Sequence, residues 1–296
     1  MEVNLLTEIL LPLALAAIML GMGLSLTPGD FKRVALYPKA VIIGLMCQLI
    51  ALPLVGFGLA LLWNLPPEYS VGIIILAACP GGPTSNLFAF LGNCDTALSI
   101  TLTAISSVVT IFSIPLIVNL GLDVFMGEAH SFRLPLLRTM LQIALITIIP
   151  VSIGMYLKAK SPRRAQRYQK AVKTASVVFI AAVIIAVVFK DRTTVIPAFR
   201  DAGPAALSLN LLTISMGYFI ASLFKLKFRQ RATIAIESGI QNGTLAIAIA
   251  ASATLLHQPE MAIPPAIYSL LMFFTGGGVA WIFSGKLPRI VDKEFN

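Results

Sequence analysis

Charged residues are scarce in this sequence. Aspartate, glutamate, lysine and arginine together make up 12% of its 296 residues, whereas a typical soluble domain contains roughly 25%. Hydrophobic residues account for 57%, and the mean hydropathy is +0.89. This composition excludes an ordinary soluble domain. It predicts an all-α polytopic membrane protein, because helices satisfy their own backbone hydrogen bonds in lipid.

Residues for metal, redox and nucleophilic chemistry are also rare. The three cysteines, Cys47, Cys79 and Cys94, form neither a metal-binding spacing nor an even-numbered disulfide framework. The sequence contains no HExxH motif, no Walker loop and no Cys–His pair. A membrane-embedded enzyme would need a nucleophile–base pair or a metal at depth. We therefore expect a protein that is not an enzyme.

Apolar segments occupy most of the chain, and most of them are long enough to cross a hydrocarbon layer about 30 Å thick. Their approximate limits are Asn4–Leu26, Ala40–Trp63, Tyr69–Leu91, Thr96–Leu120, Leu134–Leu157, Thr174–Phe189, Pro204–Phe224, Ala232–Leu255 and Ile263–Ser284. This pattern predicts about nine transmembrane helices, of which the sixth is the shortest.

The basic residues gather on alternate connections between these segments. Most of the 22 Lys and Arg residues lie in the odd-numbered connections and the C-terminal tail, most densely in Lys158–Lys173. Because cytoplasmic loops are enriched in Lys and Arg, we expect an N-terminus outside the cell, a cytoplasmic C-terminus and a location in the inner membrane. This topology accounts for the net charge of +9 without a nucleic-acid partner.

The eighth segment carries polar residues at membrane depth. Its middle reads Glu237-Ser238-Gly239-Ile240-Gln241-Asn242-Gly243-Thr244. Lipid offers such groups no hydrogen-bond partners, so they are costly unless they face protein, water or an ion. The two glycines allow the helix to unwind and to free backbone carbonyls. An interrupted helix with one carboxylate at the break is typical of a transporter's cation site; the alternative is a protonated Glu237 bonded to a neighbouring helix.

The third segment is interrupted in a similar way. Pro80-Gly81-Gly82-Pro83 cannot continue a helix, because two prolines lack amide donors and two glycines are flexible. Thr84, Ser85 and Asn86 then begin a new apolar run, and any of them could cap it. The third and eighth segments cross in opposite directions. Paired breaks of this kind indicate an inverted-repeat transporter whose site lies where the breaks meet.

Three further polar residues lie inside apolar segments. Gln48 is in the second segment, and Ser99 and Thr103 share one face of the fourth because they are four residues apart. Each has a structural alternative, which is a helix–helix hydrogen bond for Gln48 and a bond to the local backbone for the two hydroxyls. Hydroxyl, amide and carboxylate oxygens together suit a hard cation better than a soft metal.

Two motifs make the chain resemble the bile acid:sodium symporter family over nearly its whole length. They are Cys79-Pro80-Gly81-Gly82-Pro83-Thr84-Ser85-Asn86 and Glu237-Ser238-Gly239-Ile240-Gln241-Asn242, in opposed broken segments with Gln48 upstream. The resemblance implies an inverted repeat in which two broken helices cross. It also implies a core domain, at about 40–120 and 204–284, and a panel domain, at about 4–26 and 134–189.

The resemblance further implies two bound sodium ions and a set of substrate contacts. One ion would use Ser85, Asn86, Ser99, Thr103 and Glu237, and the other would use Gln48, Glu237, Gln241 and carbonyls near Ser238 and Ile240. The substrate would contact Thr84, Asn86, Asn242 and Thr244. One departure is Pro83, where family members often carry GGTASN or GGNxSN at the first break. Pro83 lacks an amide donor that could face the substrate.

These residues and the resemblance predict a sodium-coupled symporter that imports an organic anion by alternating access. The anion would be bile-acid-like, pantoate-like or another carboxylate or sulfonate. We expect the partners to be sodium, this anion and the lipid bilayer, and the protein to act as a monomer. The alternatives are an arsenite-type metalloid exporter that depends on Cys79, another anion exporter of the same superfamily, a proton-coupled carrier and a passive channel.

Overall fold

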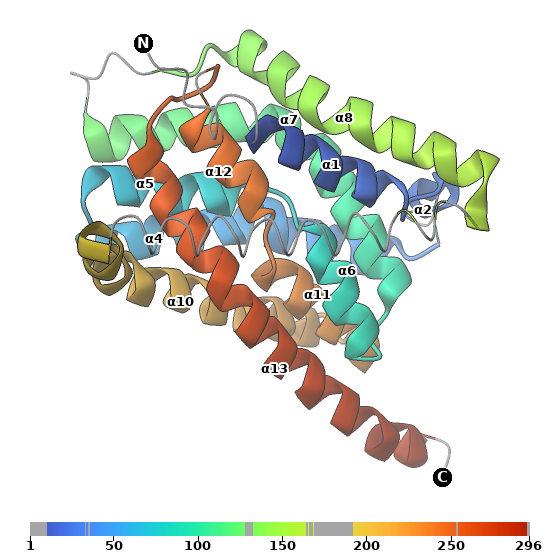
Figure 1. The fold of residues 1–296 in the computed structure, drawn as a ribbon. Coiled ribbons are helices and arrows are strands. Elements are labelled where there is room, and N and C mark those ends of the chain that lie inside the picture. The colour runs from blue at the N-terminus through green and yellow to red at the C-terminus, as the bar shows by residue number, and fades with distance from the viewer. Residues whose placement is uncertain are drawn as a thin grey trace.

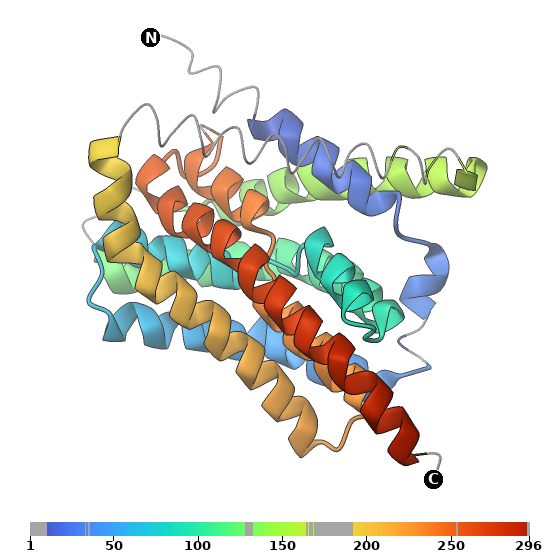
Figure 2. The same cartoon turned by 60° about the horizontal axis from the view of Figure 1, so that its bottom comes forward.

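The structure is a computed structural model, and it describes residues 11–32, 34, 36–127, 133–163, 165, 168, 192–252 and 254–294. These residues form a bundle of helices with one isolated β-bridge (Figures 1 and 2). The helices are α1 (Leu11–Gly23), α2 (Pro28–Lys32), α3 (Pro38–Met46), the π-helix η3 (Cys47–Ala51), α4 (Leu52–Leu62), α5 (Pro67–Ala78), α6 (Pro83–Leu91), α7 (Thr96–Met126), α8 (Leu136–Lys160), α10 (Arg192–Leu223), α11 (Phe228–Gly239), α12 (Gly243–Ala251), the 3₁₀-helix η4 (Pro259–Ala262) and α13 (Ile263–Glu294). The predicted all-α class is confirmed. The sixth predicted segment, Thr174–Phe189, lies outside the described residues.

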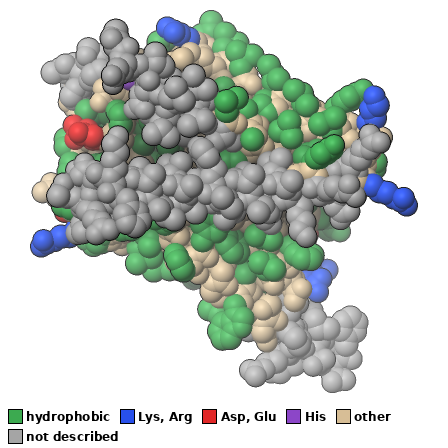
Figure 3. All heavy atoms as spheres, in the orientation of Figure 1, with side chains coloured by type: hydrophobic (Ala, Val, Ile, Leu, Met, Phe, Trp, Pro, Cys, Tyr) green, Lys and Arg blue, Asp and Glu red, His purple; other side chains and the backbone are tan. Residues whose placement is uncertain are grey.

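Within the described ranges, five helices are long and apolar enough to cross a membrane. They are Pro38–Leu62, Thr96–Met126, Leu136–Lys160, Pro197–Leu223 and Pro259–Gly285. Large apolar side chains point outward from them: Leu62 is 82% exposed and Trp281 is 78% exposed. Figure 3 shows one face of the molecule whose described surface is largely hydrophobic, with charged side chains near its outline. Such a surface is stable in lipid rather than in water, so this is a multi-pass membrane protein.

The third and eighth predicted segments each consist of two short helices separated by a break. The third is divided into α5 and α6, and the eighth into α11 and α12. Residues 79–82 and 240–242 lie between the halves and have no helical structure. Both predicted interruptions are therefore confirmed, and each leaves backbone groups without helical partners at its centre.

Helix α10 begins earlier than the sequence suggested. We expected the seventh segment to start at Pro204, but the helix starts at Arg192 and contains both Pro197 and Pro204. A proline removes one hydrogen bond from a helix interior. Membrane helices tolerate this loss, because neighbouring groups can satisfy the freed carbonyl. The prolines were therefore poor markers of the helix start.

Helices α1 and α8 pack against each other along one side of the molecule (Figures 1 and 2). Their contact is close because Gly23 and Gly154 lie in it, and a Cβ atom at either position would meet backbone atoms of the other helix within 3 Å. The two helices correspond to predicted panel segments, whereas α4, α5, α7 and α10 to α13 pack together beside them.

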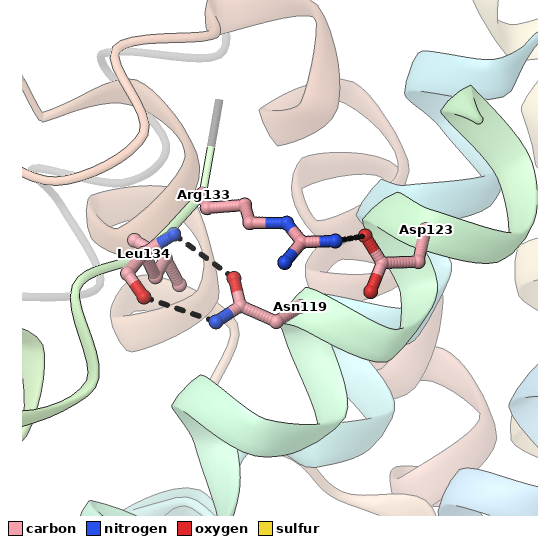
Figure 4. Close-up of polar contacts among 4 residues, drawn as sticks. All are labelled: Asn119, Asp123, Arg133 and Leu134. Atoms are coloured by element: carbon pink, nitrogen blue, oxygen red, sulfur yellow. Dashed lines mark hydrogen bonds and ion pairs between the residues drawn. The ribbon is translucent and has the colours of Figure 1, made fainter. Parts of the chain in front are cut away.

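A short polar clamp joins α7 to the start of α8. Asn119 on α7 donates to the carbonyl oxygen of Leu134 over 3.0 Å and accepts from its amide over 2.9 Å (Figure 4). The next turn of α7 carries Asp123, which pairs with Arg133 at 2.8 Å. The two side chains of this ion pair are 44% and 69% exposed, so solvent weakens their attraction.

We expect Asn119→Ala to lower the free energy of unfolding by about 2 kcal/mol, because it leaves two backbone groups of the buried Leu134 without partners. Arg133→Ala, which removes only the exposed ion pair, is expected to cost at most about 1 kcal/mol. Chemical denaturation of both variants in detergent measures the difference. Equal losses in the two variants would contradict the assignment of the clamp's stability to Asn119.

Candidate functional site

The two breaks lie against each other and share hydrogen bonds. Gly81 and Gln241 form an isolated antiparallel β-bridge. On either side of it, the Gly82 amide donates to the Ile240 carbonyl over 3.1 Å, and the Asn242 amide donates to the Pro80 carbonyl over 2.9 Å. Groups that neither helix can satisfy are thus satisfied by the opposite break. The predicted crossing of the two broken helices is confirmed.

The first half-helix begins differently from our expectation. The N-cap of α6 is Gly82, with φ −90° and ψ 160°, and Pro83 is the first helical residue. None of Thr84, Ser85 and Asn86 caps this helix, so that prediction was wrong. The reason is that the fixed φ of proline suits the first helical position, where a missing amide costs nothing. In the second half-helix, Asn242 is the N-cap of α12 and its side chain accepts from the Leu245 amide over 3.1 Å.

Glu237 lies at the centre of the crossing and is 3% exposed. Ser85 of α6 donates to its Oε1 over 2.6 Å, and Ser99 of α7 donates to the same atom. Thr103 of α7 lies 3.1 Å from Oε1 and 3.0 Å from Oε2. Three hydroxyls from two neighbouring helices therefore surround a carboxylate of α11. This confirms the predicted shared face of Ser99 and Thr103.

Asn86 extends this cluster toward the partly exposed side of α6. Its Oδ1 lies 2.8 Å from Ser99 Oγ and 3.4 Å from Thr103 Oγ1, so these hydroxyls can donate to it or to Glu237. Unlike Ser85, which is fully buried, Asn86 is only partly buried. The side chains proposed for the first sodium site, namely Ser85, Asn86, Ser99, Thr103 and Glu237, thus form one hydrogen-bonded cluster.

A second polar cluster surrounds Gln48, which lies in the π-helix η3. Its Nε2 donates to Gln241 Oε1 over 2.6 Å and to the Cys79 carbonyl over 3.2 Å. Gln241 Nε2 in turn donates to the Ser238 carbonyl over 2.8 Å. Gln48 Oε1 is buried and has no hydrogen-bond partner among the described residues. Buried acceptors rarely lack a partner, so we expect a donor or a cation to bind this oxygen.

The residues around the second break contribute through their backbone. Ser238 Oγ points toward α10, where a Cβ at Gly217 would come within 2.7 Å of it. The carbonyl of Ser238 faces Gln241, and the carbonyl of Ile240 accepts from Gly82. These are the two carbonyls that the sequence resemblance singled out. The Ser238 carbonyl belongs to the Gln48 cluster through Gln241, whereas the Ile240 carbonyl bonds to the first break.

A cavity of about 300 Å³ opens beside the crossing, between α1 and helices α6, α7, α12 and α13. The four predicted substrate contacts, Thr84, Asn86, Asn242 and Thr244, all line it. Pro83 and Gln241 line it as well, and apolar walls come from residues such as Ile18 and Phe273. The described lining residues include no Lys, Arg, His, Asp or Glu. Cys79, which a metalloid exporter would need, is buried and does not line the cavity.

Two residues at the crossing were missed by sequence reasoning. Asn210 of α10 and Tyr268 of α13 both donate to the carbonyl oxygen of Gly239, over 2.7 Å and 2.8 Å. Each is 0% exposed. The sequence carried one signal for Asn210, because its amide lies in the middle of the seventh apolar segment, as the amide of Gln48 does in the second. The π-helix around Gln48 had no recognisable signal in the sequence.

Comparison with known proteins finds sodium-dependent transporters among the relatives of this chain. Residues 12–197 match the model of the sodium bile acid symporter family. The chain is 33% identical to an uncharacterized sodium-dependent transporter, YocS, of Bacillus subtilis over 93% of its own length and 83% of that protein. It is 29% identical to the probable chloroplastic sodium/metabolite cotransporter BASS1 of Arabidopsis thaliana, covering 93% of this chain and 66% of that one.

A rabbit relative extends the comparison to animals. The chain is 27% identical to the ileal sodium/bile acid cotransporter of Oryctolagus cuniculus, over 79% of this chain and 67% of that protein. All three relatives are named as transporters and none as an enzyme. The family match spans more than half of the chain, and a membrane transporter family agrees with the long apolar helices. This chain therefore belongs to the sodium bile acid symporter family, whose members couple transport to sodium.

Proposed function

We propose that this protein imports a small organic anion together with sodium by alternating access. The observation that carries the proposal is the environment of Glu237. Its buried carboxylate contacts three hydroxyl groups at the point where the two breaks meet. A carboxylate is costly at membrane depth unless a cation or a proton neutralises it. Oxygen ligands of this kind suit a hard cation, and sodium is the ion named for the relatives.

Two sodium ions share Glu237 in this proposal. The first binds to the oxygens of Ser85, Asn86, Ser99 and Thr103 as well as Glu237, and the hydroxyl hydrogens that now point at the carboxylate turn away from the ion. The second lies near Gln48, Gln241 and the carbonyls of Ser238 and Ile240. The buried, unpartnered Oε1 of Gln48 supports this second position, because a cation satisfies an orphaned acceptor.

The substrate occupies the cavity beside the crossing. Since its described lining carries no charged side chain, the anion must be attracted by other positive groups. The N-termini of α6 and α12 both begin at the cavity, and helix N-termini attract anions through their amides and dipole. Thr84, Asn86, Asn242 and Thr244 supply polar contacts at this end, and the apolar walls receive the rest of the molecule. Pro83 reduces the number of amides that α6 can offer.

Alternating access requires two parts that move relative to each other. We assign α1 and α8 to a panel domain and the crossing with its supporting helices to a core domain. The cavity between α1 and the core helices supports this division, because substrate and ions then lie at the boundary that opens and closes. We place the N-terminus outside, the C-terminus in the cytoplasm and the protein in the inner membrane as a monomer. The basic connections of the sequence support this orientation.

Sodium is expected to raise the melting temperature of the purified protein saturably, whereas potassium and choline are not. Binding at one hundred times the dissociation constant stabilises a protein by about 2.7 kcal/mol. Gln48→Met, which removes the amide but keeps an apolar chain of similar length, should weaken this response. A proton-coupled carrier would instead respond to pH and not to sodium. Absence of any sodium-specific shift in the wild type would overturn the proposed function.

A further inference from the structure

The carbonyl oxygen of Gly239 is held by side chains and not by a helix. In a continuous helix it would accept from the amide of Gly243, four residues later. That amide instead donates to the Gln241 carbonyl over 3.0 Å. Asn210 and Tyr268 take its place, from two different helices and at 2.7 Å and 2.8 Å. Because a carbonyl oxygen has two lone pairs, these two donors occupy it fully.

The Asn210 contact repeats a contact at the other break. The antiparallel bridge between Gly81 and Gln241 relates the two breaks by a local two-fold symmetry. Cys79, two residues before Gly81, therefore corresponds to Gly239, two residues before Gln241. Gln48 donates to the Cys79 carbonyl over 3.2 Å, and Asn210 donates to the Gly239 carbonyl. Each amide lies on the helix that precedes its broken pair in the chain. Asn210 is thus the counterpart of Gln48 in the second half of the molecule.

The surroundings leave the Gly239 region little freedom. A Cβ atom at Gly239 would lie 2.1 Å from Cγ1 of Ile214 on α10, so the backbone already packs directly against that helix. Asn210 is on the same helix, and Tyr268 approaches on α13. The turn can therefore rotate only if these two hydrogen bonds break. Such a rotation would move the Ser238 carbonyl, which accepts from Gln241, and the Ile240 carbonyl, which accepts from Gly82.

We propose that Asn210 and Tyr268 are positioning residues for sodium. They bind the Gly239 carbonyl and thereby hold the backbone on either side of it, which carries the Ser238 and Ile240 carbonyls assigned to the second sodium ion. The inference rests on the proposed function, because it assigns these residues a role in that same site. Neither residue is a ligand: both act through the backbone conformation of the second break.

The test is sodium-dependent uptake into proteoliposomes by Tyr268→Phe, measured against sodium concentration with a carboxylate or sulfonate that the wild type transports. The variant removes one hydroxyl and keeps the ring. Losing one hydrogen bond to a buried carbonyl corresponds to about a tenfold weaker equilibrium. We therefore expect about a tenfold rise in the sodium concentration for half-maximal uptake. The maximal rate and the half-saturation for the anion at saturating sodium should stay within about twofold.

Tyr218→Phe is the matched control. Tyr218 also lies at the core, where its ring stacks on Phe283, and the same substitution there should leave the sodium response unchanged. Combining Asn210→Leu with Tyr268→Phe should cost more than the product of the two single effects, because only the double variant leaves the carbonyl without any donor. The sodium-induced rise in melting temperature gives a second readout for variants with little transport.

The outcomes separate this inference from the proposed function. A wild type without sodium dependence would overturn both. A sodium-dependent wild type with an unshifted sodium response in Tyr268→Phe would overturn the positioning role alone. A lower maximal rate at an unchanged sodium half-saturation would also overturn it, since this is the result of a purely structural role.

Discussion

Glu237→Gln is expected to lower sodium-driven uptake about 1,000-fold while the protein still inserts into the membrane. Glutamine has nearly the same size and shape, so packing between α6, α7 and α11 is retained. What is lost is the negative charge that both proposed sodium ions share. A unit charge 4 Å from a cation contributes about 4 kcal/mol at an effective dielectric constant of 20, which corresponds to about three orders of magnitude in an equilibrium constant.

The measurement is initial uptake into proteoliposomes under an inward sodium gradient. Glu260→Gln is the matched control, because Glu260 is an exposed carboxylate in η4 and the same loss of charge there should leave uptake unchanged. Glu237→Gln should also lose the sodium-dependent rise in melting temperature that the wild type shows. Undiminished sodium-driven uptake by Glu237→Gln would show that the carboxylate does not bind the transported ion.

Gly81→Ala is expected to reduce uptake about 10- to 100-fold. A Cβ atom at this position would lie 2.5 Å from Oε2 of Glu237, well inside contact distance. The carboxylate cannot retreat freely, since Ser85, Ser99 and Thr103 bind it from the other directions. Forcing a methyl group into a packed interior costs about 1–3 kcal/mol, and here the cost falls on the ion site itself.

Gly58→Ala provides the control for this prediction. Gly58 lies in α4, and its added Cβ would meet no described atom within 4 Å. The substitution favours the helix by about 1 kcal/mol at most, so uptake should equal that of the wild type. Sodium half-saturation should rise in Gly81→Ala but not in Gly58→Ala. If both glycine variants transport normally, the distance between Gly81 and the carboxylate has no functional consequence.

The sequence alone identified the membrane class, the two interrupted segments and the carboxylate at the second break. These follow from local properties. Composition determines which solvent a surface tolerates, and proline and glycine interrupt a helix wherever they fall. The shared face of Ser99 and Thr103 follows from the period of the helix. None of these inferences needs contacts between distant parts of the chain.

The family resemblance implied that the two breaks meet, but only the tertiary structure shows which atoms bond across them. Ser85 and Glu237 are 152 residues apart, and Gln48 and Gln241 are 193 residues apart. Such pairs depend on how whole helices pack, which no local pattern encodes. Packing also decided that α10 continues through Pro197 and Pro204. The start of α6 is instead a local effect: Pro83 takes the first helical position after Gly82, ahead of the three polar residues that were candidate caps.

The clearest case is the Gly239 carbonyl. The sequence indicated that Gly239 would free a carbonyl at the second break, because glycine allows a helix to unwind. It did not indicate which groups would satisfy that carbonyl. Asn210 and Tyr268 reach it from helices 29 residues away on either side in the chain. A buried carbonyl must find donors somewhere, but the choice among possible donors is made by the packing of the folded bundle.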